Sequence, residues 1–591
     1  MCGIFGYIGN RDASGIVLEG LRLLESRGYD SWGMAIKIKD RLEVEKHVGE
    51  IGNVKYNPYP SILNHKSYLG IGHTRWATHG GVTVTNAHPH LDCTKKIAVV
   101  HNGIIENFLE LKMGLVKKGH RFVSETDTEV AAHLIEENFK QAEFPQAVKN
   151  AFGKFTGMNA ILAVASDLNQ IIAVKNGSPF VVGIGENEYF IASDALGIIR
   201  HTRNLLFLKD NEMVILGDKL RLFSLPDGEE IKAKPQTVNW KTENAEKGKY
   251  KHFMIKEIYE QPRVIRNIAE NYDRKIKDLA GIIRKARGTF FIGAGTAYYA
   301  AIGGTYLFST VAKMHVNAAV ASEFNYLENF LNKDSLIVAL SQSGETIDVV
   351  EPLTRAKKRN SLIAAITNTL GSSIYRLADY KLLLEAGPEK AVASTKAYTA
   401  KLSILILLSF ALIGKNQEGK SLLVQAYREV KRILNQKNIK KIQKLADKLY
   451  QSEHIYTIGR GLSYSTALES ALKIKEVSYI HAEGFAGGEL KHGTLALISR
   501  GTACMVFAPA DETYEAVISN AVEVKARGGF IIGISPKRAK VFDYWIKVND
   551  CKQASLIAQI VPAQILGYFL AVKKGLDPDK PRNLAKSVTV K

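Results

Sequence analysis

The chain has 591 residues, too many for a single hydrophobic core, and its composition of 46% hydrophobic and 23% charged residues is that of a globular protein with about three or four domains. The net charge is +20, and the whole excess lies in residues 241–591, because residues 1–240 hold equal numbers of basic and acidic side chains. No nucleic-acid-binding motif accompanies this charge, and the four cysteines are too far apart to encode a disulfide framework or a zinc site, so the composition argues against those classes of protein.

The chain opens MCGIFGYIGN, which places Cys2 directly after the initiator methionine. Once Met1 is removed, Cys2 would carry a thiol and a free α-amine on one residue, and so a nucleophile beside its own proton acceptor. The pKa of an α-amine is about 7.7–8.0, so the unprotonated base is available near neutral pH. Taken alone, Cys2 is also consistent with a buried or incidental thiol.

Residues 1–240 are rich in short β-type runs broken by glycines and turns, such as GMAIKIK, YLGIGHT, KIAVVHNG, MNAILAVAS and EYFIAS. Two helical stretches interrupt these runs, around residues 12–26 and 125–141. The pattern predicts a strand-rich α+β domain over residues 1–240. A polar stretch at 238–252 follows it, and we expect a linker over residues 241–274.

Five segments of this domain occur together in one order: CGIFGYIG, ESRGYDSWGMA, HTRWATHG, VVHNGIIENF and SETDTEV. In this combination they resemble the N-terminal-nucleophile glutamine amidotransferases, whose domain is an αββα sandwich. The resemblance implies that Cys2 attacks the side-chain amide of glutamine, forms a glutamyl thioester and releases ammonia. It also implies that Asn102 and the backbone N–H of Gly103 form the oxyanion hole, whose donors act on charge as it develops.

The same resemblance assigns the rest of the glutamine site. Arg75 would hold the α-carboxylate of glutamine as a two-pronged donor, and Asp127 would pair with its α-ammonium. Trp76, Thr78 and His79 would complete and cover the pocket. Each residue alone has an ordinary explanation, such as a helix cap for Asp127, so the functional interpretation depends on their occurring together.

His88 and His90, in AHPH, resemble metal ligands at first sight. No carboxylate or thiol lies at metal-binding spacing from them, so we expect a structural role for both. The sequence therefore predicts no metal site.

From about residue 275 the rhythm changes to strand, glycine turn and helix, in the segments 289–303, 335–353 and 362–368. This alternation predicts a parallel sheet with helices on its faces. The plan returns with nearly the same spacing in the segments 455–473, 502–517 and 530–535. The repeat predicts a duplicated α/β domain, with copies at 275–430 and 440–591.

Two turns, GAGTAYYA and SQSGETIDV, join a strand to a helix and are rich in hydroxyl groups. Backbone N–H groups, hydroxyls and the positive end of a helix dipole together suit a phosphate, and an anionic substrate would also fit the basic second half. An ordinary cluster of helix N-caps is the alternative. The predicted phosphate contacts are Thr296, Ser341, Gln342, Ser343 and Thr346.

The duplicated domain resembles the sugar isomerase (SIS) family of phosphosugar-binding domains. Four further segments extend the resemblance: HFMIKEIYEQP, EAGPEKAVASTKAYTA, ALKIKEVSYIHAEGFAGGELKHG and DKPRNLAKSVTV. With the first domain, they make the whole chain similar to the family of isomerising glutamine–fructose-6-phosphate aminotransferases. That resemblance implies that glutamine and fructose 6-phosphate give glucosamine 6-phosphate and glutamate, the first step of amino-sugar biosynthesis, without a metal or organic cofactor.

The residues of the family's synthase site have counterparts in this chain. Lys586 matches the amine that forms a Schiff base with the sugar. His492 matches the histidine that opens the sugar ring from the neighbouring subunit, which implies a homodimer with a shared site. Glu476 matches the base that moves a proton between C1 and C2, and Lys473, three residues earlier on the same helix face, would support it. The remaining sugar contacts implied are Val392, Ser394 and Ala585.

One residue departs from the family pattern, because the first turn usually reads GTS and here Ala297 replaces the serine. A hydrogen bond to a charged group is worth about 1.5–3 kcal/mol, so we expect weaker or rerouted phosphate binding. This leaves open a related SIS-domain amidotransferase or deglycase that acts on another phosphosugar. A phosphoribosyl-pyrophosphate amidotransferase would need an acidic pyrophosphate loop, which we do not find, and a sugar-phosphate sensor would not need the N-terminal set.

The sequence also bears on where the protein acts. No secretory leader is visible, and the longest apolar run, residues 402–414, is shorter than the roughly 20 residues that a membrane crossing needs. With few cysteines and no nucleic-acid motif, we expect a cytoplasmic protein that engages neither membrane nor nucleic acid.

Overall fold

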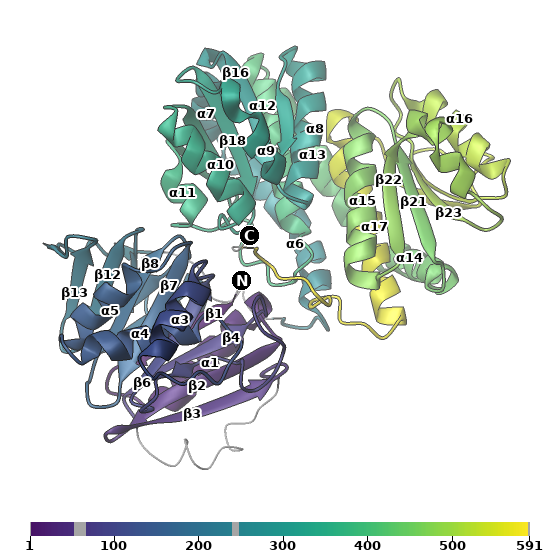
Figure 1. The fold of residues 1–591 in the computed structure, drawn as a ribbon. Coiled ribbons are helices and arrows are strands. Elements are labelled where there is room, and N and C mark those ends of the chain that lie inside the picture. Colours follow the sequence, from purple (N-terminus) through teal and green to yellow (C-terminus); the bar gives the residue numbers. More distant parts are fainter. Residues whose placement is uncertain (1, 53–66, 239–246, 589–591) are drawn as a thin grey trace. The chain divides into compact units, whose positions relative to one another are not determined.

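A computed structural model describes residues 2–52, 67–238 and 247–588 (Figure 1). The chain divides into two compact units, one formed by residues 1–243 with 585–591 and the other by residues 244–584. Each unit has its own apolar core.

The first unit is built on two antiparallel sheets. The first sheet contains, in spatial order, β15 (Gln236–Thr237), β11 (Asn204–Phe207), β9 (Val181–Ile184), β10 (Tyr189–Ala192), β1 (Gly3–Ile8), β4 (Leu69–Arg75), β2 (Ser31–Ile38) and β3 (Arg41–Val48). The second contains β14 (Glu230–Ile231), β13 (Leu220–Ser224), β12 (Glu212–Leu216), β8 (Ile171–Asn176), β7 (Asn159–Ala165), β6 (Ile97–Gly103) and β5 (His90–Leu91).

The two sheets face each other across an apolar core, and helices cover their outer faces. Ile4 and Ile71 of the first sheet share this core with Val100 of the second. Because side chains alternate along a strand, Phe5 faces the other way and packs under α1. This four-layer arrangement confirms the predicted αββα sandwich (Figure 1). The helices of the unit are α1 (Ala13–Leu24), α3 (Phe108–Lys117), α4 (Glu129–Phe139) and α5 (Phe144–Phe152).

The second unit contains two parallel sheets with the same strand order. The first sheet runs β17 (Asn317–Val320), β16 (Gly288–Gly293), β18 (Ser335–Ser341), β19 (Leu362–Thr367) and β20 (Tyr380–Leu383). The other runs β22 (His481–Ala486), β21 (His454–Gly459), β23 (Ala503–Phe507), β24 (Phe530–Ser535) and β25 (Tyr544–Lys547). In both, the second strand in the chain lies at one edge and the first lies beside the third, which is a doubly wound order. The predicted duplication is therefore confirmed.

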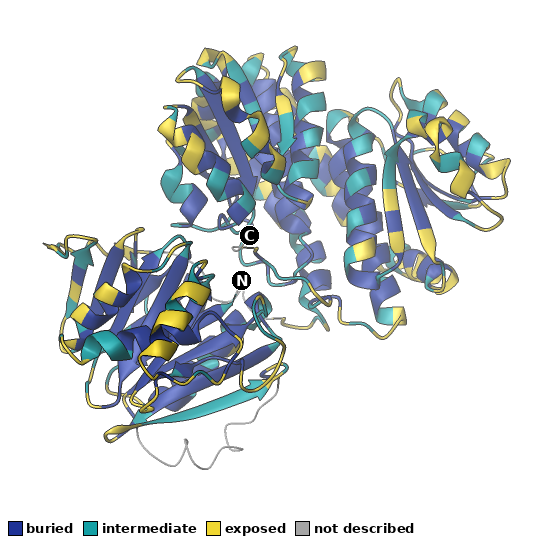
Figure 2. Cartoon of the chain, viewed as in Figure 1, coloured by how far each residue is buried: buried dark blue, intermediate teal, exposed yellow. Residues whose placement is uncertain are grey.

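Helices cover the faces of both parallel sheets. Their bounds are α6 (Phe253–Asn271), α7 (Asp273–Lys285), α8 (Thr296–Leu307), α9 (Ala321–Leu327), α10 (Ile347–Lys358), α11 (Ser373–Leu377), α12 (Lys396–Leu412), α13 (Asn416–Ile433), α14 (Gln436–Leu449), α15 (Leu462–Ser478), α16 (Tyr514–Lys525) and α17 (Ser555–Lys573). Figure 2 shows that the central strands and the central helices are buried while the outer helices expose one face. Helix α15 packs on α8 and α17, so the two copies share one core.

The two copies also repeat a backbone conformation. Gly295 precedes α8 with φ of 51° and ψ of −124°, and Gly461 precedes α15 with φ of 52° and ψ of −131°. Residues with a side chain rarely adopt this backbone conformation, so each copy requires a glycine at the turn that follows its first strand.

The expected linker over residues 241–274 requires correction. Most of it is helix α6, whose buried residues include Met254, Ile258 and Ile265. These positions recur at helical spacing and pack the helix against α12 and α13. The polar stretch that suggested a linker ends before this helix begins.

Helix α17 lies at the centre of the second unit. The helical segment Lys552–Lys573 is long and apolar enough to cross a membrane by length and hydropathy alone, but 89% of its apolar 18-residue stretch is buried inside the protein. Packing against α15 and α14 accounts for its apolar character.

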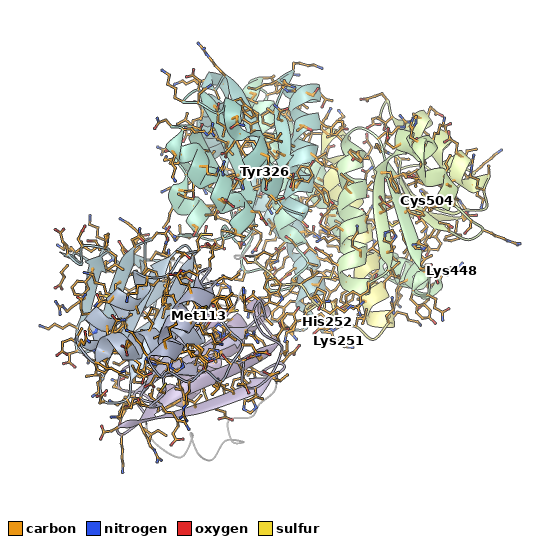
Figure 3. The ribbon with its side chains drawn as sticks, in the orientation of Figure 1. Met113, Lys251, His252, Tyr326, Lys448 and Cys504 are labelled. Carbon is orange, nitrogen blue, oxygen red and sulfur yellow. The ribbon has the colours of Figure 1, made fainter. Side chains whose placement is uncertain are left out.

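Two of the four cysteines are buried in the second unit. Cys504, labelled in Figure 3, lies on β23 with no exposed surface, and Cys551 is 2% exposed. Burial raises the pKa of both thiols to about 12, so neither is poised for thiolate chemistry. Cys2 and Cys93, both in the first unit, are the more accessible thiols.

Candidate active sites

A pocket in the first unit brings together all eight residues predicted for the glutamine site. It forms where β1 begins, where β4 and β6 end, and where the segment before α4 passes. Strands β1 and β4 are paired with Gly3 opposite Thr74, so Cys2 and Arg75 are brought together by register. The lining residues are Cys2, Arg75, Trp76, Thr78, His79, His88, His101, Asn102, Gly103, Thr126, Asp127 and Thr128.

The Cys2 sulfur is held against the backbone of Trp76. The Trp76 N–H donates to Cys2 Sγ at 3.2 Å, and Sγ lies 3.6 Å from Trp76 O. Burial raises the pKa of the Cys2 thiol, while the Trp76 N–H and the Arg75 guanidinium act to lower it. Donors that stabilise the thiolate therefore surround a thiol that burial keeps protonated until a base removes the proton.

Asn102 is oriented by a histidine that the sequence analysis did not single out. His73 Nε2 lies 3.2 Å from Asn102 Oδ1 and 3.0 Å from His101 O. Burial lowers the pKa of His73 to about 3, so the ring is neutral and must carry its proton on Nε2 to donate to both oxygens. The Asn102 amide is thereby turned with Nδ2 as a donor, and Nδ2 donates to Cys2 O at 3.0 Å.

Gly103 ends β6 in a conformation that requires glycine. Its φ is 128°, and a Cβ there would meet Met158 O at 2.1 Å. A side chain at this position would collide with the backbone of Met158, just before β7. Gly103 thus has a structural reason to be glycine in addition to its predicted role as a backbone donor.

Arg75 and Asp127 are buried on the pocket wall. Arg75 is 3% exposed and donates to the carbonyl oxygens of His79, Gly80 and Gly81, which uses three of its five donors and fixes the plane of the guanidinium. Asp127 Oδ2 accepts from Ile105 N at 2.8 Å. The two side chains are therefore held by the protein itself, as a site for a zwitterionic amino acid requires.

The remaining predicted residues lie at the rim. Trp76 and His79 are half-buried and Thr78 is exposed, and the His79 ring lies edge-on to Phe108. His88 and His90, for which a structural role was expected, are both buried, and His88 also lines the pocket. His88 stacks on His73 at 4.1 Å between ring centroids, and His90 Nε2 lies 3.0 Å from Thr126 Oγ1.

In the second unit, the predicted phosphate contacts lie on two neighbouring turns. Thr296 follows β16, and Ser341 to Thr346 follow β18, so both turns lie at the carboxyl ends of adjacent strands. Strand order reverses between these two strands, and ligands of doubly wound sheets bind at that point. The turns also precede helices α8 and α10, whose N-termini favour an anion.

The turn after β18 is organised by its own hydroxyl groups. Ser341 Oγ accepts from Gly344 N at 3.0 Å and lies 3.2 Å from Thr346 Oγ1. Ser343 Oγ accepts from Glu345 N at 3.2 Å, and Gln342 O accepts from Asn368 N at 3.1 Å. The structure thus holds these residues in one small loop, and their contact with a phosphate remains a prediction.

A buried charge network lies on α15. Lys473 has no exposed surface, its Nζ donates to Glu476 Oε2 at 2.5 Å, and it lies 3.6 Å from Glu469 Oε1. Burial alone would lower the pKa of Lys473, but the two carboxylates raise it. The hydrogen bond from Lys473 to Glu476 is the contact that the predicted support of Glu476 needs.

Glu469 was missed by the sequence analysis. It is fully buried, and burial raises its pKa to about 8. Thr296 Oγ1 donates to Glu469 Oε1 at 3.2 Å, which links the first SIS copy to α15 of the second. The signal was present as the spacing of Glu469, Lys473 and Glu476, which repeats at four and three residues along one helix face.

The other predicted synthase residues are more dispersed. Ser394 Oγ donates to Glu389 Oε2 at 2.8 Å, and Val392 N donates to Asp579 O at 3.0 Å. His492 is exposed and ends the 3₁₀ helix Gly487–His492. Ala585 and Lys586 group with the first unit and are half-buried, so their predicted roles at the sugar stay predictions.

Family models match both halves of the chain. The glutamine amidotransferase domain matches residues 73–199, which hold Arg75, Asn102 and Asp127. The SIS domain matches twice, at residues 282–411 and 448–541, once in each copy of the duplicated domain.

Known proteins match over the full length. The chain is 43% identical over 617 residues to the glutamine–fructose-6-phosphate aminotransferase (isomerizing) of Caldanaerobacter subterraneus subsp. tengcongensis, and 43% identical over 605 residues to that of Thermococcus kodakarensis, with 100% of each chain covered in both cases. The solved C-terminal domain of glucosamine-fructose-6-phosphate aminotransferase from Francisella tularensis is 34% identical, with a TM-score of 0.53, and the match covers 56% of this chain and 99% of that one. The chain belongs to the family of isomerising glutamine–fructose-6-phosphate aminotransferases.

Proposed function

We propose that this protein transfers the amide nitrogen of glutamine to fructose 6-phosphate, isomerises the product to glucosamine 6-phosphate and releases glutamate. The observation that carries the proposal is the pocket where Cys2, Asn102 and Gly103 lie together. The chain that holds this pocket is related over its full length to proteins named glutamine–fructose-6-phosphate aminotransferase (isomerizing). The relatives' name also disfavours another phosphosugar as the substrate.

The first half-reaction takes place at Cys2. With Met1 removed, the α-amine of Cys2 accepts the thiol proton, and the sulfur adds to the amide carbon of glutamine. The C–N bond breaks, the proton leaves with the nitrogen as ammonia, and water hydrolyses the thioester to glutamate and free thiol. Asn102 Nδ2 and the Gly103 N–H would stabilise the oxyanion, and Arg75 and Asp127 would hold the two charges of the amino acid.

The second half-reaction takes place on the sugar. Lys586 forms a Schiff base with the carbonyl of the opened sugar, ammonia takes the place of the lysine nitrogen, and Glu476 moves a proton from C1 to C2. Lys473 Nζ donates to Glu476 Oε2 and so fixes the position of the carboxylate that moves the proton. The hydroxyl-rich turns after β16 and β18 hold the phosphate.

We further propose that the enzyme is a cytoplasmic homodimer in which His492 of one chain opens the sugar ring in the other. The exposure of His492 on its own chain supports this arrangement. Mixed dimers of His492→Ala and Lys586→Ala chains should then regain activity at hybrid sites. Absence of recovery despite proven subunit exchange would exclude a shared site.

A product assay tests the proposed reaction directly. Purified protein is incubated with glutamine and fructose 6-phosphate, and glutamate and amino sugar are quantified together. We expect equal amounts of the two products, and for Cys2→Ala we expect neither product but unchanged binding of fructose 6-phosphate by calorimetry. Amino sugar made by Cys2→Ala from glutamine would contradict the proposal.

A further inference from the structure

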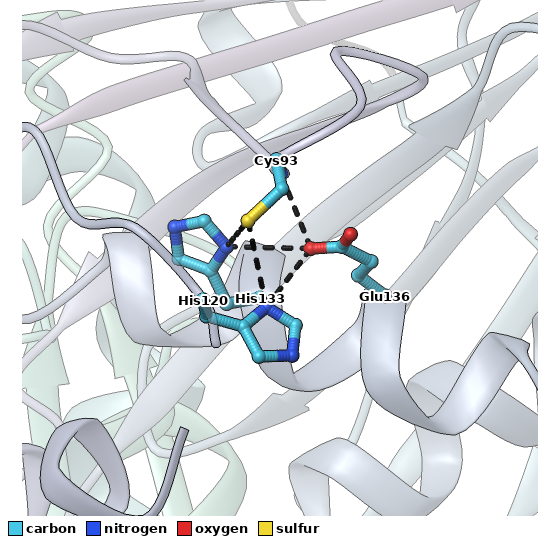
Figure 4. A group of neighbouring side chains, drawn as sticks. All are labelled: Cys93, His120, His133 and Glu136. Carbon is cyan, nitrogen blue, oxygen red and sulfur yellow. Dashed lines mark hydrogen bonds and ion pairs between the residues drawn. The ribbon is translucent and has the colours of Figure 1, made fainter. Parts of the chain in front are cut away.

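A group of four potential metal ligands lies in the first unit, outside the glutamine pocket. Cys93, His120, His133 and Glu136 each direct one ligand atom to a common centre, and these atoms all lie within 4.8 Å of one another (Figure 4). The sequence analysis expected no metal site, because the cysteines are far apart and His88 and His90 lack partners at metal-binding spacing. The four ligands found here come from three separate segments.

Four of the six distances between the ligand atoms lie close to the edges of a tetrahedral zinc site. Cys93 Sγ lies 3.6 Å from His120 Nδ1 and 3.4 Å from His133 Nδ1. Glu136 Oε2 lies 3.0 Å from His120 Nδ1 and 3.4 Å from His133 Nδ1. Zinc bond lengths of about 2.3 Å to sulfur and about 2.0–2.1 Å to nitrogen and oxygen give tetrahedral edges of about 3.5 Å for S···N and about 3.3 Å for N···O.

A network of hydrogen bonds explains this arrangement less well than a shared cation. Each Nδ1–H can be donated along one direction, yet both Nδ1 atoms lie at contact distance from both the sulfur and the carboxylate oxygen. Four ligand atoms around one centre are the expected result when a cation takes the place of those protons. Thiolate, two imidazoles and a carboxylate form a donor set that suits Zn²⁺ and neutralises its charge.

The outer contact of His120 also fits metal binding. His120 Nε2 is at hydrogen-bond distance, 3.3 Å, from Glu137 Oε2, whereas His133 Nε2 lies 3.5 Å from Glu129 Oε1 without a hydrogen bond. Metal-bound histidines usually give their second N–H to a carboxylate, which fixes the tautomer that presents the other nitrogen to the metal. Both imidazoles are buried, at 6% and 1% exposure, and so are shielded from competing water.

The ligands stand on segments that are already fixed. His133 and Glu136 lie three residues apart on one face of α4. Cys93 lies in the turn between β5 and β6, where Asp92 accepts from Thr94 N and Ile97 N, and Cys93 N itself donates to Glu136 Oε2 at 3.1 Å. A site of this kind needs little reorganisation to accept its ion.

We propose that these four residues form a structural Zn²⁺ site. Four protein ligands leave no open position for a substrate, so the ion has a structural role. The site would clamp α4 to the turn at Cys93 and the loop at His120. Glu129 connects this site to the glutamine pocket. It contacts His133 and also accepts hydrogen bonds from Val123 N and Ser124 N. These two residues begin the segment that carries Asp127 into the pocket.

Metal analysis of the full chain tests the proposal without reference to activity. Protein purified without a histidine tag is stripped with a chelator, dialysed against Zn²⁺ and analysed for bound metal by mass spectrometry. We expect one Zn²⁺ per chain and a higher melting temperature with Zn²⁺ than without. Cys93→Ala should lose the ion, whereas the matched control His315→Ala, an exposed histidine outside the cluster, should retain it. Glu137→Gln should weaken Zn²⁺ affinity about 10- to 100-fold.

Co²⁺ provides a readout that does not depend on a variant folding. Co²⁺ bound to the wild-type chain should show a sulfur-to-metal charge-transfer band, and the band should disappear in Cys93→Ser. If the wild-type chain binds no more Zn²⁺ than Cys93→Ala, or if bound Co²⁺ shows no sulfur band, the proposed site is wrong.

Discussion

Replacing His73 by phenylalanine tests whether this histidine acts by orienting Asn102. The change keeps a ring of similar size against His88 and removes the donor that lies 3.2 Å from Asn102 Oδ1 and 3.0 Å from His101 O. A neutral hydrogen bond is worth about 0.5–1.5 kcal/mol net, which corresponds to a fall of about 2- to 12-fold in kcat for glutamine hydrolysis. KM should change little, because an oxyanion donor acts mainly in the transition state.

The assay is glutamate release at saturating fructose 6-phosphate, in a cycle with Asn102→Ala. Asn102→Ala alone should lower kcat about 100- to 1000-fold, as loss of an oxyanion donor does elsewhere. Adding His73→Phe to Asn102→Ala should then cost almost nothing further, since the residue it orients has gone. His47→Phe, at an imidazole on β3 outside the pocket lining, is the control and should leave kcat unchanged. If His73→Phe costs as much in the Asn102→Ala background as alone, His73 does not act through Asn102.

Three further predictions concern the phosphate turn, the buried acid and pH. Ala297→Ser should restore a hydroxyl to the first turn and lower KM for fructose 6-phosphate about tenfold, by the value of a hydrogen bond to a charged group; an unchanged KM would show that the phosphate lies elsewhere. The pKa of Glu469 is about 8 in the folded protein, so the folded state still holds a proton that the unfolded state loses near pH 4.5. Glu469 therefore lowers the stability of the fold as pH rises from 4.5 to 8. The free energy of unfolding of Glu469→Gln, measured with urea, should rise relative to that of the wild type by up to about 1.4 kcal/mol per pH unit between pH 5 and 8. If the two free energies change with pH in parallel, this prediction is wrong. Burial lowers the pKa of His73 to about 3, so below pH 6.5 the unfolded state binds a proton that the folded state does not. The first unit should therefore lose stability as pH falls from 6.5 towards 4. This loss should be less steep in His73→Phe.

The glutamine site could be predicted from the sequence because its residues lie at the ends of strands. Cys2 precedes β1, Arg75 ends β4, and Asn102 and Gly103 end β6, so short motifs mark positions that antiparallel pairing and sheet packing bring to one edge. The duplication could be predicted for a similar reason, since each glycine turn must follow a strand of a parallel sheet.

The residues that were missed act through partners distant in the chain. His73 lies within the motif HTRW, but its role depends on the Asn102 side chain from another sheet. Glu469 acquires its raised pKa from burial between two domain copies. The ligands Cys93, His120 and His133 are separated by loops whose paths no local spacing specifies.

Helix α6 shows a different reason for error. Its polar N-terminal neighbour suggested a linker, while its apolar positions, among them Met254, Ile258 and Ile265, become informative only once α12 and α13 are known to cover them. Tertiary packing, and not local propensity, decides the state of this segment.

The central claim is that the nitrogen freed at Cys2 is the nitrogen that reaches the sugar. It is tested most directly with amide-¹⁵N-labelled glutamine, fructose 6-phosphate and an excess of unlabelled ammonium, with the amino sugar analysed by mass spectrometry. Our account predicts glucosamine 6-phosphate that carries ¹⁵N almost exclusively, and none from the Cys2→Ala protein. Product that carries mainly the unlabelled nitrogen, or labelled product from Cys2→Ala, would contradict it.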